Sequence, residues 1–376
     1  MSASDLVTLR AQASAHDALT GLKQALASLF DAMLAARCGP HHFVAMRWSA
    51  PDPAALHPSR HVVDLAWREV FGGFRPPLAL TARVGDAVEI EIDCRPPGAP
   101  SDAAVYRGYT LPALAGQYSP RNQADMREVF RQWTADGGTF RAGHQGLDLA
   151  YGPGPYHTLD LYRPTNASGP LPLWFFLHGG YWQASDKDQH AQFARGMLDA
   201  GFAVAMPNYR LAPDAPLAAI VEDVRAALAF TLAQADALGI DATNVHVAGH
   251  SAGGHLAAML ALESGTPIRS ALLLSGLFDL EPLAYLPVGK LLGLHARGAV
   301  GALSPIRRKP IAGVRIGVAV GAGESDEFKR QSTELAAAWG APPPLVLAGA
   351  HHFSLLDGLN GGPLLDLATS LVAPAR

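Results

Sequence analysis

The amino-acid sequence predicts an α/β fold, a doubly wound and mostly parallel sheet preceded by a small α+β domain. Beyond about Val105, short runs that are apolar along their whole length alternate with helical patterns, as expected for parallel strands buried on both faces. A serine flanked by glycines follows one of these runs. A proline- and glycine-rich stretch, Pro96–Pro100, marks a division of the chain. We therefore expect a small domain over 1–96, a linker over 97–104 and a larger domain over 105–376.

The smaller expected domain begins with an amphipathic helix over Asp17–Ala36, where leucines and a methionine recur at helical spacing. The run Ala87–Ile92 alternates apolar with acidic residues, which is typical of a strand with one buried face. Between them, the patterns predict a strand over Phe43–Trp48, a helix over Val62–Phe71 and a strand over Leu78–Ala82.

The larger expected domain contains seven apolar runs that predict strands, with helical patterns between most of them. The stretch from Leu280 to Pro305 has no clean strand pattern. We expect it to form a lid, at about 280–305, over the carboxyl ends of the strands, where such sheets bind ligands. The predicted strands are 159–162, 173–177, 203–206, 245–248, 271–274, 316–320 and 345–347, and the predicted helices are 189–198, 218–237, 254–262 and 328–339.

Composition narrows the function classes open to this chain of 376 residues. Hydrophobic residues make up 49% and charged residues 16%, and the net charge of −4 provides no basic surface for nucleic acid or an anionic membrane. Two cysteines, Cys38 and Cys94, are too few for a disulfide framework, and no Cys/His spacing is typical of a metal site. Met1–Asp5 lacks a signal-peptide pattern, and no apolar run reaches the roughly 18 residues of a membrane span. We expect a soluble cytoplasmic protein without metal or other cofactor.

The candidate nucleophile is Ser251, at the centre of the run Gly249–Gly253. The apolar run Val245–Ala248 precedes it and an alanine- and leucine-rich helix pattern follows, so the serine stands at the turn between a strand and a helix. Glycines on both sides allow the backbone to turn tightly and the helix to pack close to the strand. The alternative interpretation is a helix N-terminus with Ser251 as its cap.

A serine nucleophile needs a base and an acid, which follow it along the chain in this type of fold. His351 and His352 come just after the last predicted strand, and one of them is expected to face the serine. The loop after the preceding strand holds two candidate acids, Glu324 and Asp326. The start of a helix near residue 327 accounts for Asp326 without catalysis, which favours Glu324, while Asp279 is a third candidate that is expected to cap a helix instead.

An acyl-transfer site must also stabilise the oxyanion of the tetrahedral intermediate. The run Leu177–Trp182 ends an apolar strand with adjacent glycines, which let the N–H groups of Gly180 and Tyr181 turn toward a bound oxygen. The N–H of Ala252, directly after the nucleophile, is expected to complete this oxyanion hole. The alternative is an ordinary Gly-Gly turn.

Residues 105–376 resemble the kynurenine formamidase (arylformamidase) branch of the α/β-hydrolases. The resemblance implies that the base is His352, in a His-Phe pair, and that the acid is Glu324. It further implies that His178 shapes the oxyanion loop. The matching motifs are His178–Trp182, Asn208–Pro213, Gly249–Gly254 and Glu324–Ser332, the last of which contains the most specific signature, Glu-Phe-x-Arg-Gln-Ser.

The same resemblance implies a substrate with an N-formyl group on an aromatic amine. A formyl group needs almost no acyl pocket, whereas the aromatic leaving group needs a flat apolar slot. The residues expected to bind substrate are Gly179, Trp182 and Phe353, with Tyr181 as a further wall. Tyr118 is another candidate, although ordinary core packing is the favoured interpretation for that side chain.

Residues from about 17 to 96 are similar to a shortened Rid-type (YjgF-like) imine deaminase domain. The similarity rests on the helix, the strand–helix pair and the run from Pro76 to Ile92. Leu78 stands where that family carries a substrate-binding arginine, and the opening hairpin strands are not evident. We therefore expect this domain to serve in packing or in oligomerisation, since Rid proteins are usually trimers.

The leading hypothesis is a serine hydrolase that cleaves an aryl formamide or amide bond through an acyl-enzyme, with Ser251, His352 and Glu324 as its triad. One alternative is a carboxylesterase or a carbamate or amide hydrolase for aromatic substrates. An alternative of another class is a hydrolase-like binding module without catalysis, and a further one is a bifunctional enzyme with an active deaminase domain. The expected partners are a small aromatic amide or ester and further copies of the chain, with neither nucleic acid nor membrane.

Overall fold

The computed structural model describes residues 6–15, 17–36, 38, 42–57, 61–71, 74, 76–85, 87–95, 103–119, 126–146 and 148–372. The chain divides into two compact units, Met1–Asp102 and Ala103–Arg376. The stretch Pro96–Pro100, on which the expected linker depends, lies outside the described residues. Among the described helices, none is both long and apolar enough to cross a lipid bilayer.

The smaller unit contains a four-stranded sheet in the order β1-β4-β2-β3. The first strand was not predicted, although Val7–Ser14 alternates apolar with polar residues and pairs antiparallel with β4 along its whole length. Similarity to imine deaminases and a role in oligomerisation stay predictions. The elements are β1 (Val7–Ser14), α1 (Ala18–Ala35), β2 (Phe43–Ala50), η3 (Ala54–Leu56), α2 (His61–Phe71), β3 (Leu78–Ala82) and β4 (Ala87–Cys94).

Strand β4 shows how the sequence pattern forms the core of this unit. Val88, Ile90 and Ile92 are completely buried in the same apolar cluster as the leucines of α1. The acidic residues between them lie on the other face, where Glu91 and Asp93 form ion pairs with Arg47 at 2.9 and 2.8 Å. Because successive side chains of a strand point to opposite faces of the sheet, the alternating sequence gives β4 one buried face and one charged face.

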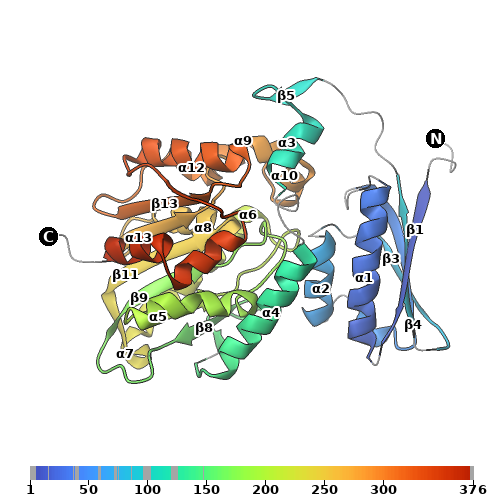
Figure 1. Ribbon diagram of the computed structural model, residues 1–376, viewed down its shortest axis with the longest axis horizontal. Helices are drawn as coiled ribbons and strands as arrows, with labels where there is room; N and C mark the ends of the chain where they lie inside the picture. Colours follow the sequence, from blue (N-terminus) through green and yellow to red (C-terminus); the bar gives the residue numbers. More distant parts are fainter. Residues whose placement is uncertain are drawn as a thin grey trace. The chain divides into compact units, whose positions relative to one another are not determined.

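The larger unit contains an eight-stranded sheet in the order β14-β13-β12-β11-β9-β10-β8-β7 (Figure 1). Strand β8 runs antiparallel to both of its neighbours, and every other pair of neighbouring strands is parallel. The predicted α/β class with a mostly parallel sheet is confirmed. The strands are β7 (Leu149–Ala150), β8 (Thr158–Tyr162), β9 (Leu171–Leu177), β10 (Ala203–Pro207), β11 (Ile240–His250), β12 (Ile268–Leu274), β13 (Arg315–Gly321) and β14 (Leu345–Leu347).

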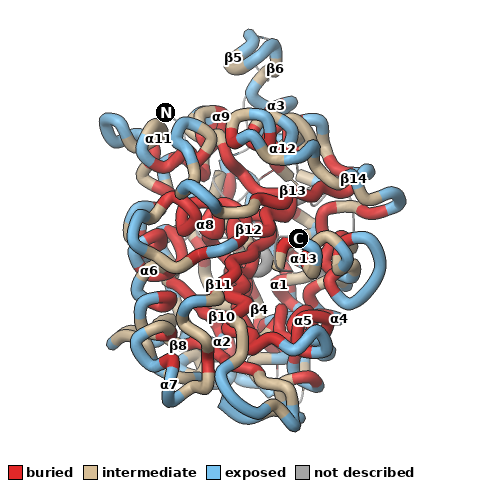
Figure 2. The backbone as a smooth tube through the Cα atoms, turned by 90° about the vertical axis from the view of Figure 1, so that its left-hand side faces the viewer, coloured by how far each residue is buried: buried red, intermediate tan, exposed pale blue. Residues whose placement is uncertain are grey.

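Helices cover both faces of this sheet, and the central strands are buried between them (Figure 2). Alternate residues of β9 divide between two apolar cores: Leu173 and Phe175 join one, Trp174 and Phe176 the other. The helices are α3 (Leu111–Gln117), α4 (Met126–Ala142), η5 (Asp188–Ala194), α5 (Arg195–Asp199), α6 (Leu217–Ala233), α7 (Ala235–Leu238), α8 (Ala252–Leu260), α12 (Asp326–Trp339), η7 (Ser354–Asn360) and α13 (Pro363–Val372), and a small hairpin joins β5 (Ala104–Tyr106) to β6 (Tyr109–Thr110).

The segment expected to form a lid contains short helices and no strand. Its leucines, among them Leu283, Leu286 and Leu292, belong to the same core as Leu173 and Phe175. The segment is therefore packed against the larger unit instead of extending away from it. Its elements are α9 (Glu281–Ala284), α10 (Pro287–Leu291), α11 (Ala299–Leu303) and η6 (Pro305–Arg307).

Helix α4 was not predicted, and a glycine allows it to pack against η5. A Cβ atom at Gly137 would lie 2.0 Å from the carbonyl oxygen of Asp188, so no other residue fits there without moving backbone. At the end of the helix, the Arg141 guanidinium donates to Asp160 and Asp188 at 2.8 and 2.7 Å. These contacts attach α4 to the sheet and to the 3-10 helix beneath it.

We expect Gly137→Ala to destabilise the larger unit by about 1–3 kcal/mol, because the added methyl group must push two backbones apart. Gly138 is its matched control, since a Cβ there meets no atom within 4 Å. Gly138→Ala is expected to be neutral or stabilising by up to about 1 kcal/mol, as alanine favours helix more than glycine does. Thermal unfolding followed by circular dichroism measures both changes, and equal shifts for the two variants would contradict this packing argument.

Candidate active site

Ser251 occupies a strained turn between β11 and α8. Its backbone angles are φ 56° and ψ −119°, a region that non-glycine residues rarely adopt. The neighbouring glycines are required by space, because a Cβ at Gly253 would lie 2.0 Å from the carbonyl oxygen of Leu177. The Ser251 side chain makes no capping hydrogen bond to α8, which disfavours the helix-cap interpretation. The strained backbone and the lack of a capping hydrogen bond agree with the sharp strand-to-helix turn expected for a nucleophilic serine.

His352 and Glu324 form a buried pair at the carboxyl end of the sheet. The Nδ1 atom of His352 lies 2.7 Å from Oε2 of Glu324, and the two residues are 1% and 3% exposed. The other carboxylate oxygen of Glu324 accepts hydrogen bonds from the hydroxyl of Ser275 and, at 2.8 Å, from the N–H of Gly321. Every described partner of this carboxylate is therefore a hydrogen-bond donor or a ring that can be cationic.

These contacts determine the charge of Glu324. Burial by itself raises the pKa of a carboxyl group. In Glu324 the charge interaction and hydrogen bond with His352, and the hydrogen bonds from Ser275 and Gly321, outweigh burial and hold the pKa below its ordinary value. The carboxylate is thus ionised at neutral pH and is available to orient the imidazole.

The other candidate acids and the second histidine have different positions. Asp326 is an exposed residue in the first turn of α12, where an acidic side chain interacts favourably with the helix dipole. Asp279 accepts from the Tyr106 hydroxyl at 3.2 Å and from the N–H of Glu281, the first residue of α9, at 3.2 Å, although the N-cap position itself is Leu280. The ring of His351 accepts from the N–H of Phe353 at 3.2 Å and so stabilises the start of η7.

Two close approaches bring the segments of the candidate site together. The Nε2 atom of His250, the residue before Ser251, lies 2.7 Å from the carbonyl oxygen of His352, and their rings are 4.6 Å apart. A Cβ at Gly179 would lie 3.3 Å from Cβ of Ser251, so the loop after β9 lies against this serine. Burial and the neighbouring His352 lower the pKa of His250, so its ring is neutral and donates a hydrogen bond to that carbonyl.

The loop after β9 has the backbone expected of an oxyanion hole. The carbonyl of Gly180 (φ 113°) accepts from two N–H groups of the same turn at 3.0 Å, and Tyr181 follows at φ 56°. Within the described residues, the N–H groups of Gly180 and Tyr181 donate to no backbone acceptor. Ala252 is the first residue of α8, and the first N–H groups of a helix have no acceptor within it.

The expected aromatic slot is not assembled as predicted. Trp182 is completely buried in the core that contains Leu173, where its ring meets His255 edge-on at 5.1 Å. Phe353 belongs to the core on the opposite face of the sheet, so these two rings do not form one slot. Tyr118, in the described part of the chain, donates to Glu327 at 2.6 Å in a buried position, which agrees with core packing. Of the aromatic residues expected to form the substrate slot, Tyr181, in the loop after β9, is half-buried, and the others are buried.

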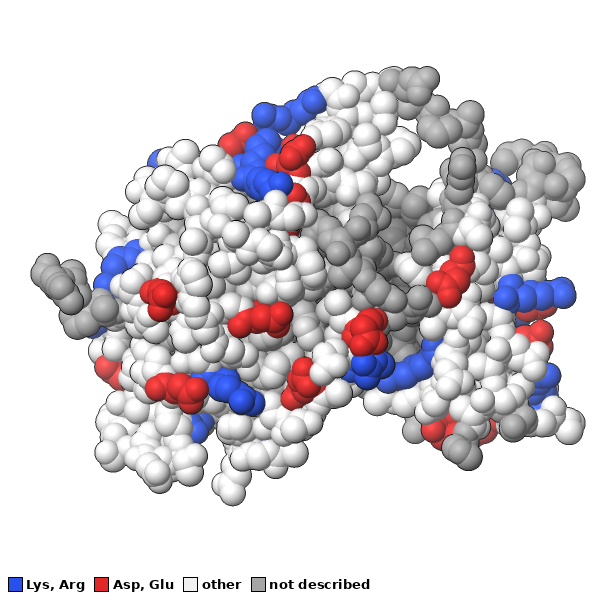
Figure 3. Space-filling view, viewed as in Figure 1, with Lys and Arg blue, Asp and Glu red and all other residues white. Residues whose placement is uncertain are grey.

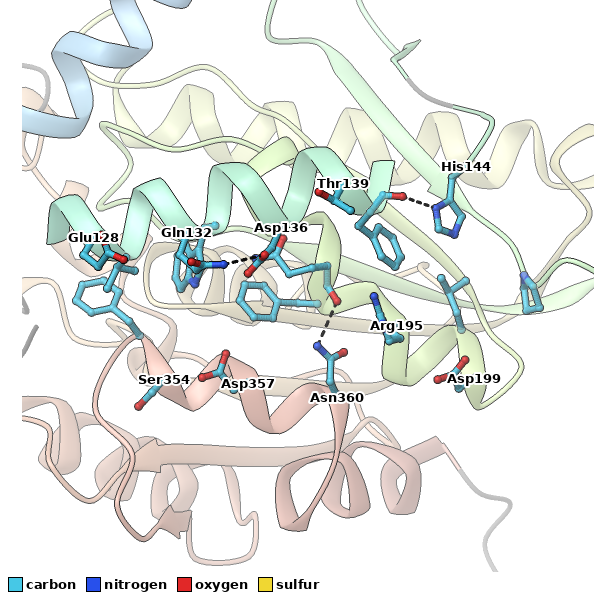
Figure 4. A pocket seen from close by; sticks show the side chains of 18 of the residues that line it. Glu128, Gln132, Asp136, Thr139, His144, Arg195, Asp199, Ser354, Asp357 and Asn360 are labelled. Carbon is cyan, nitrogen blue, oxygen red and sulfur yellow. Dashed lines mark hydrogen bonds between the residues drawn. The ribbon is translucent and has the colours of Figure 1, made fainter. Parts of the chain in front are cut away.

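A groove of about 1250 Å³ runs along α4, away from the nucleophile (Figure 4). Trp133, Phe353 and His351 line it, together with Asp357 of η7. Ser251 does not line this groove. Phe353, which lines the groove, also contacts the candidate site, since its ring meets the His352 ring at 5.3 Å.

Charge gives no indication of a polyanionic ligand. On the face drawn in Figure 3, acidic and basic side chains of the larger unit are interspersed and no broad basic surface forms. Among the described residues, no group of three or more His, Cys, Asp or Glu is placed to hold a metal ion.

Similarity in sequence to known proteins assigns the chain to a family. The BD-FAE family model matches residues 159–272. The kynurenine formamidase of Danio rerio is 31% identical over 263 residues, which cover 65% of this chain and 87% of that protein. The chain belongs to the kynurenine formamidase family. The predicted family is thus confirmed, and the chain is an enzyme of the hydrolase class.

Solved structures are similar in fold to this member of the kynurenine formamidase family. A Silicibacter protein provisionally described as a thioesterase is 33% identical with a TM-score of 0.59, and the match covers 65% of this chain and 93% of that one. An esterase of Pyrobaculum calidifontis has a TM-score of 0.53 at 22% identity over 69% of this chain and 97% of its own, a likeness of fold alone. The α/β-hydrolase fold is confirmed.

Two residues with no predicted role hold the candidate site of this kynurenine formamidase family member together. Ser275 donates to Glu324, and His250 joins the His352 loop to the nucleophile turn. Ser275 is the first polar residue after the buried run of β12, and polar residues at the carboxyl ends of parallel strands often serve a site. That position is the signal from which its role could have been predicted.

Proposed function

We propose that this enzyme hydrolyses N-formyl aromatic amines, of the class of N-formylkynurenine, with Ser251 as nucleophile, His352 as base and Glu324 as the acid that orients it. The observation that best supports the proposal is the buried contact of 2.7 Å between His352 and Glu324, on a loop that His250 attaches to the nucleophile turn. Membership of the kynurenine formamidase family supports the choice of bond.

The proposed reaction has two stages. His352 Nε2 takes the proton of Ser251 as Oγ attacks the formyl carbon, and the oxygen that becomes negative accepts from the N–H groups of Gly180, Tyr181 and Ala252. The imidazolium then gives its proton to the departing aromatic nitrogen, which leaves a formyl ester on the serine. In the second stage His352 takes a proton from water, the resulting hydroxide attacks the ester, and formate leaves as Ser251 recovers its proton.

The burial of the nucleophile supports a small acyl group. Ser251 is 6% exposed and His352 is 1% exposed, so little space is open around the reacting atoms. A formyl group places only a hydrogen atom where longer acyl groups place a carbon chain. This favours a formamide over an ester or amide of a long acid.

A turnover screen tests the proposal. We expect N-formylkynurenine to have a kcat/KM at least about tenfold above those of the matched aryl acetate, carbamate and acetanilide, since one added methyl group costs 1–3 kcal/mol in a closed pocket. Formate release is measured with formate dehydrogenase and the free aniline by absorbance. Preference for the ester or the carbamate would instead identify an esterase or a carbamate hydrolase.

Labelling with a covalent probe tests Ser251 as the nucleophile directly. A fluorophosphonate probe is expected to label the folded wild-type protein and Ser264→Ala, in which an exposed turn serine is replaced, but not Ser251→Ala. Absence of labelling in the folded wild-type protein would contradict the assignment of Ser251 as the nucleophile.

A further inference from the structure

The loop from His178 to Lys187, which contains the proposed oxyanion hole, has a strained backbone that needs support from the surrounding structure. Besides Gly180, three residues without glycine's freedom have positive φ angles: Tyr181 and Trp182 at 56° and Ser185 at 71°. Such conformations persist only where the surrounding structure holds them. The external contacts of the loop from His178 to Lys187 therefore decide where its N–H groups point.

One short segment supplies such contacts at the beginning, middle and end of this loop. Asn208–Ala212 follows β10, which is next to β9 in the sheet. The Tyr209 hydroxyl donates to the carbonyl of His178 at 2.7 Å, and the N–H of Ala212 donates to the carbonyl of Trp182 at 2.7 Å. The side-chain oxygen of Asn208 accepts from the N–H of Lys187 at 2.8 Å.

Tyr209 also fixes the side chain that begins the loop. Its ring is completely buried and stacks on the imidazole of His178, with centroids 4.3 Å apart and an interplanar angle of 8°. The Nδ1 atom of His178 in turn lies 2.7 Å from the carbonyl oxygen of Gly179. Both the main chain and the side chain of His178 are thus set by one tyrosine.

The segment is itself held rigidly. Arg210 forms a two-point ion pair with Asp223 of α6, at 2.8 and 2.6 Å. The carbonyl of Asn208 accepts from the Tyr151 hydroxyl at 2.6 Å, and its N–H donates to Thr158 of β8 at 2.9 Å. The segment is therefore attached to α6, to β8 and to Tyr151 just after β7, in addition to the loop that it holds.

We propose that Asn208 and Tyr209 are positioning residues that set the direction of the oxyanion-hole N–H groups. This inference rests on the proposed function of Ser251 and its oxyanion hole. The two side chains act through the backbone of the loop and touch neither substrate nor nucleophile. Their replacement should therefore weaken stabilisation of the tetrahedral intermediate while leaving substrate binding largely intact.

Tyr209→Phe is the sharpest test, because it keeps the ring on His178 and removes only the hydroxyl. We expect kcat to fall about 10- to 100-fold, less than the 10²–10³ that follows the complete loss of an oxyanion donor. KM is expected to stay within about twofold. Affinity for an aryl trifluoromethyl ketone, whose serine adduct carries an oxyanion, should fall in parallel with kcat.

Thr231→Val is the matched control. Thr231 is also completely buried, and its hydroxyl donates to the carbonyl of Ala227 within helix α6 at 2.8 Å. Loss of this buried hydroxyl is expected to change kcat by less than about twofold. An equal fall of kcat in the two variants, or a Tyr209→Phe enzyme that is folded and fully active, would overturn the proposal.

Two variants at Asn208 test the same proposal even if the Tyr209→Phe protein does not fold. Asn208→Ala removes the acceptor for the Lys187 N–H and is expected to lower kcat, whereas Asn208→Asp retains an acceptor oxygen and should lower it less. No effect of Asn208→Ala on kcat would count against the proposal. Because an oxyanion hole serves esters as well as formamides, the same ratios are measured on an aryl ester. They therefore remain informative if the formamide preference fails.

Discussion

Ser251→Ala is expected to lower kcat by at least about 10⁴-fold, because the nucleophile and its base act as one unit. The change removes one oxygen atom from a position where the backbone is already strained, so folding is expected to be unaffected. Initial rates with N-formylkynurenine measure the loss, and thermal unfolding verifies the fold. His352→Ala should cost about as much.

A double variant shows whether Ser251 and His352 act together in catalysis or contribute to the rate independently. If Ser251 and His352 act together, Ser251→Ala combined with His352→Ala should be scarcely slower than either single variant. Ser264→Ala serves again as the control with full activity. Turnover above about one per cent of wild type in purified Ser251→Ala would show that another group is the nucleophile.

Glu324→Gln is expected to lower kcat by about 10³- to 10⁴-fold. Glutamine has the same shape, but its N–H₂ group can donate to Nδ1 of His352 and favour the tautomer whose Nε2 carries a proton and cannot accept one from serine. Asp326→Asn is the matched comparison, since Asp326 is exposed two residues away, and its kcat should stay within about twofold of wild type. A severe loss in Asp326→Asn alone would reassign the acid.

The carboxylate of Glu324 also makes the stability of the fold depend on pH, and the direction of this dependence follows from the pKa shift. Because the pKa of Glu324 in the folded protein lies below the ordinary value of 4.5, its contribution to folding free energy is fully present above that pH. The contribution is lost as the pH falls through the folded-state pKa. Unfolding of Glu324→Gln should accordingly vary less with pH in the acid range.

The strands of the larger unit were predictable because burial on both faces leaves an unbroken apolar run, and all seven predicted runs overlap strands of the sheet. Strand β1 was missed although Val7–Ser14 alternates correctly, because alanines occupy part of its inward positions and give a weak apolar signal. Helix α4 was missed because Gly137 and Gly138 reduce helix propensity at its centre, where packing against η5 demands one of them.

The candidate site was predictable to the extent that it depends on chain order. The carboxyl ends of parallel strands meet at one edge, so motifs after β9, β11 and β13 were expected to converge. The aromatic slot was not predictable, because it depends on side-chain direction. The positive φ angle of Trp182 accompanies a ring buried on one face of the sheet, while Phe353 directly precedes η7 and packs on the other.

The absence of space beside Gly253 has a consequence for redesign of this enzyme. A Cβ at that position would lie 2.0 Å from the Leu177 carbonyl oxygen and 2.4 Å from that of His178, so the turn at Ser251 and the end of β9 fit together in one arrangement. Mutant libraries that diversify residues 249–253 should consist almost wholly of dead clones. Variation confined to 280–305 leaves that junction intact and is the better route to altered substrate range.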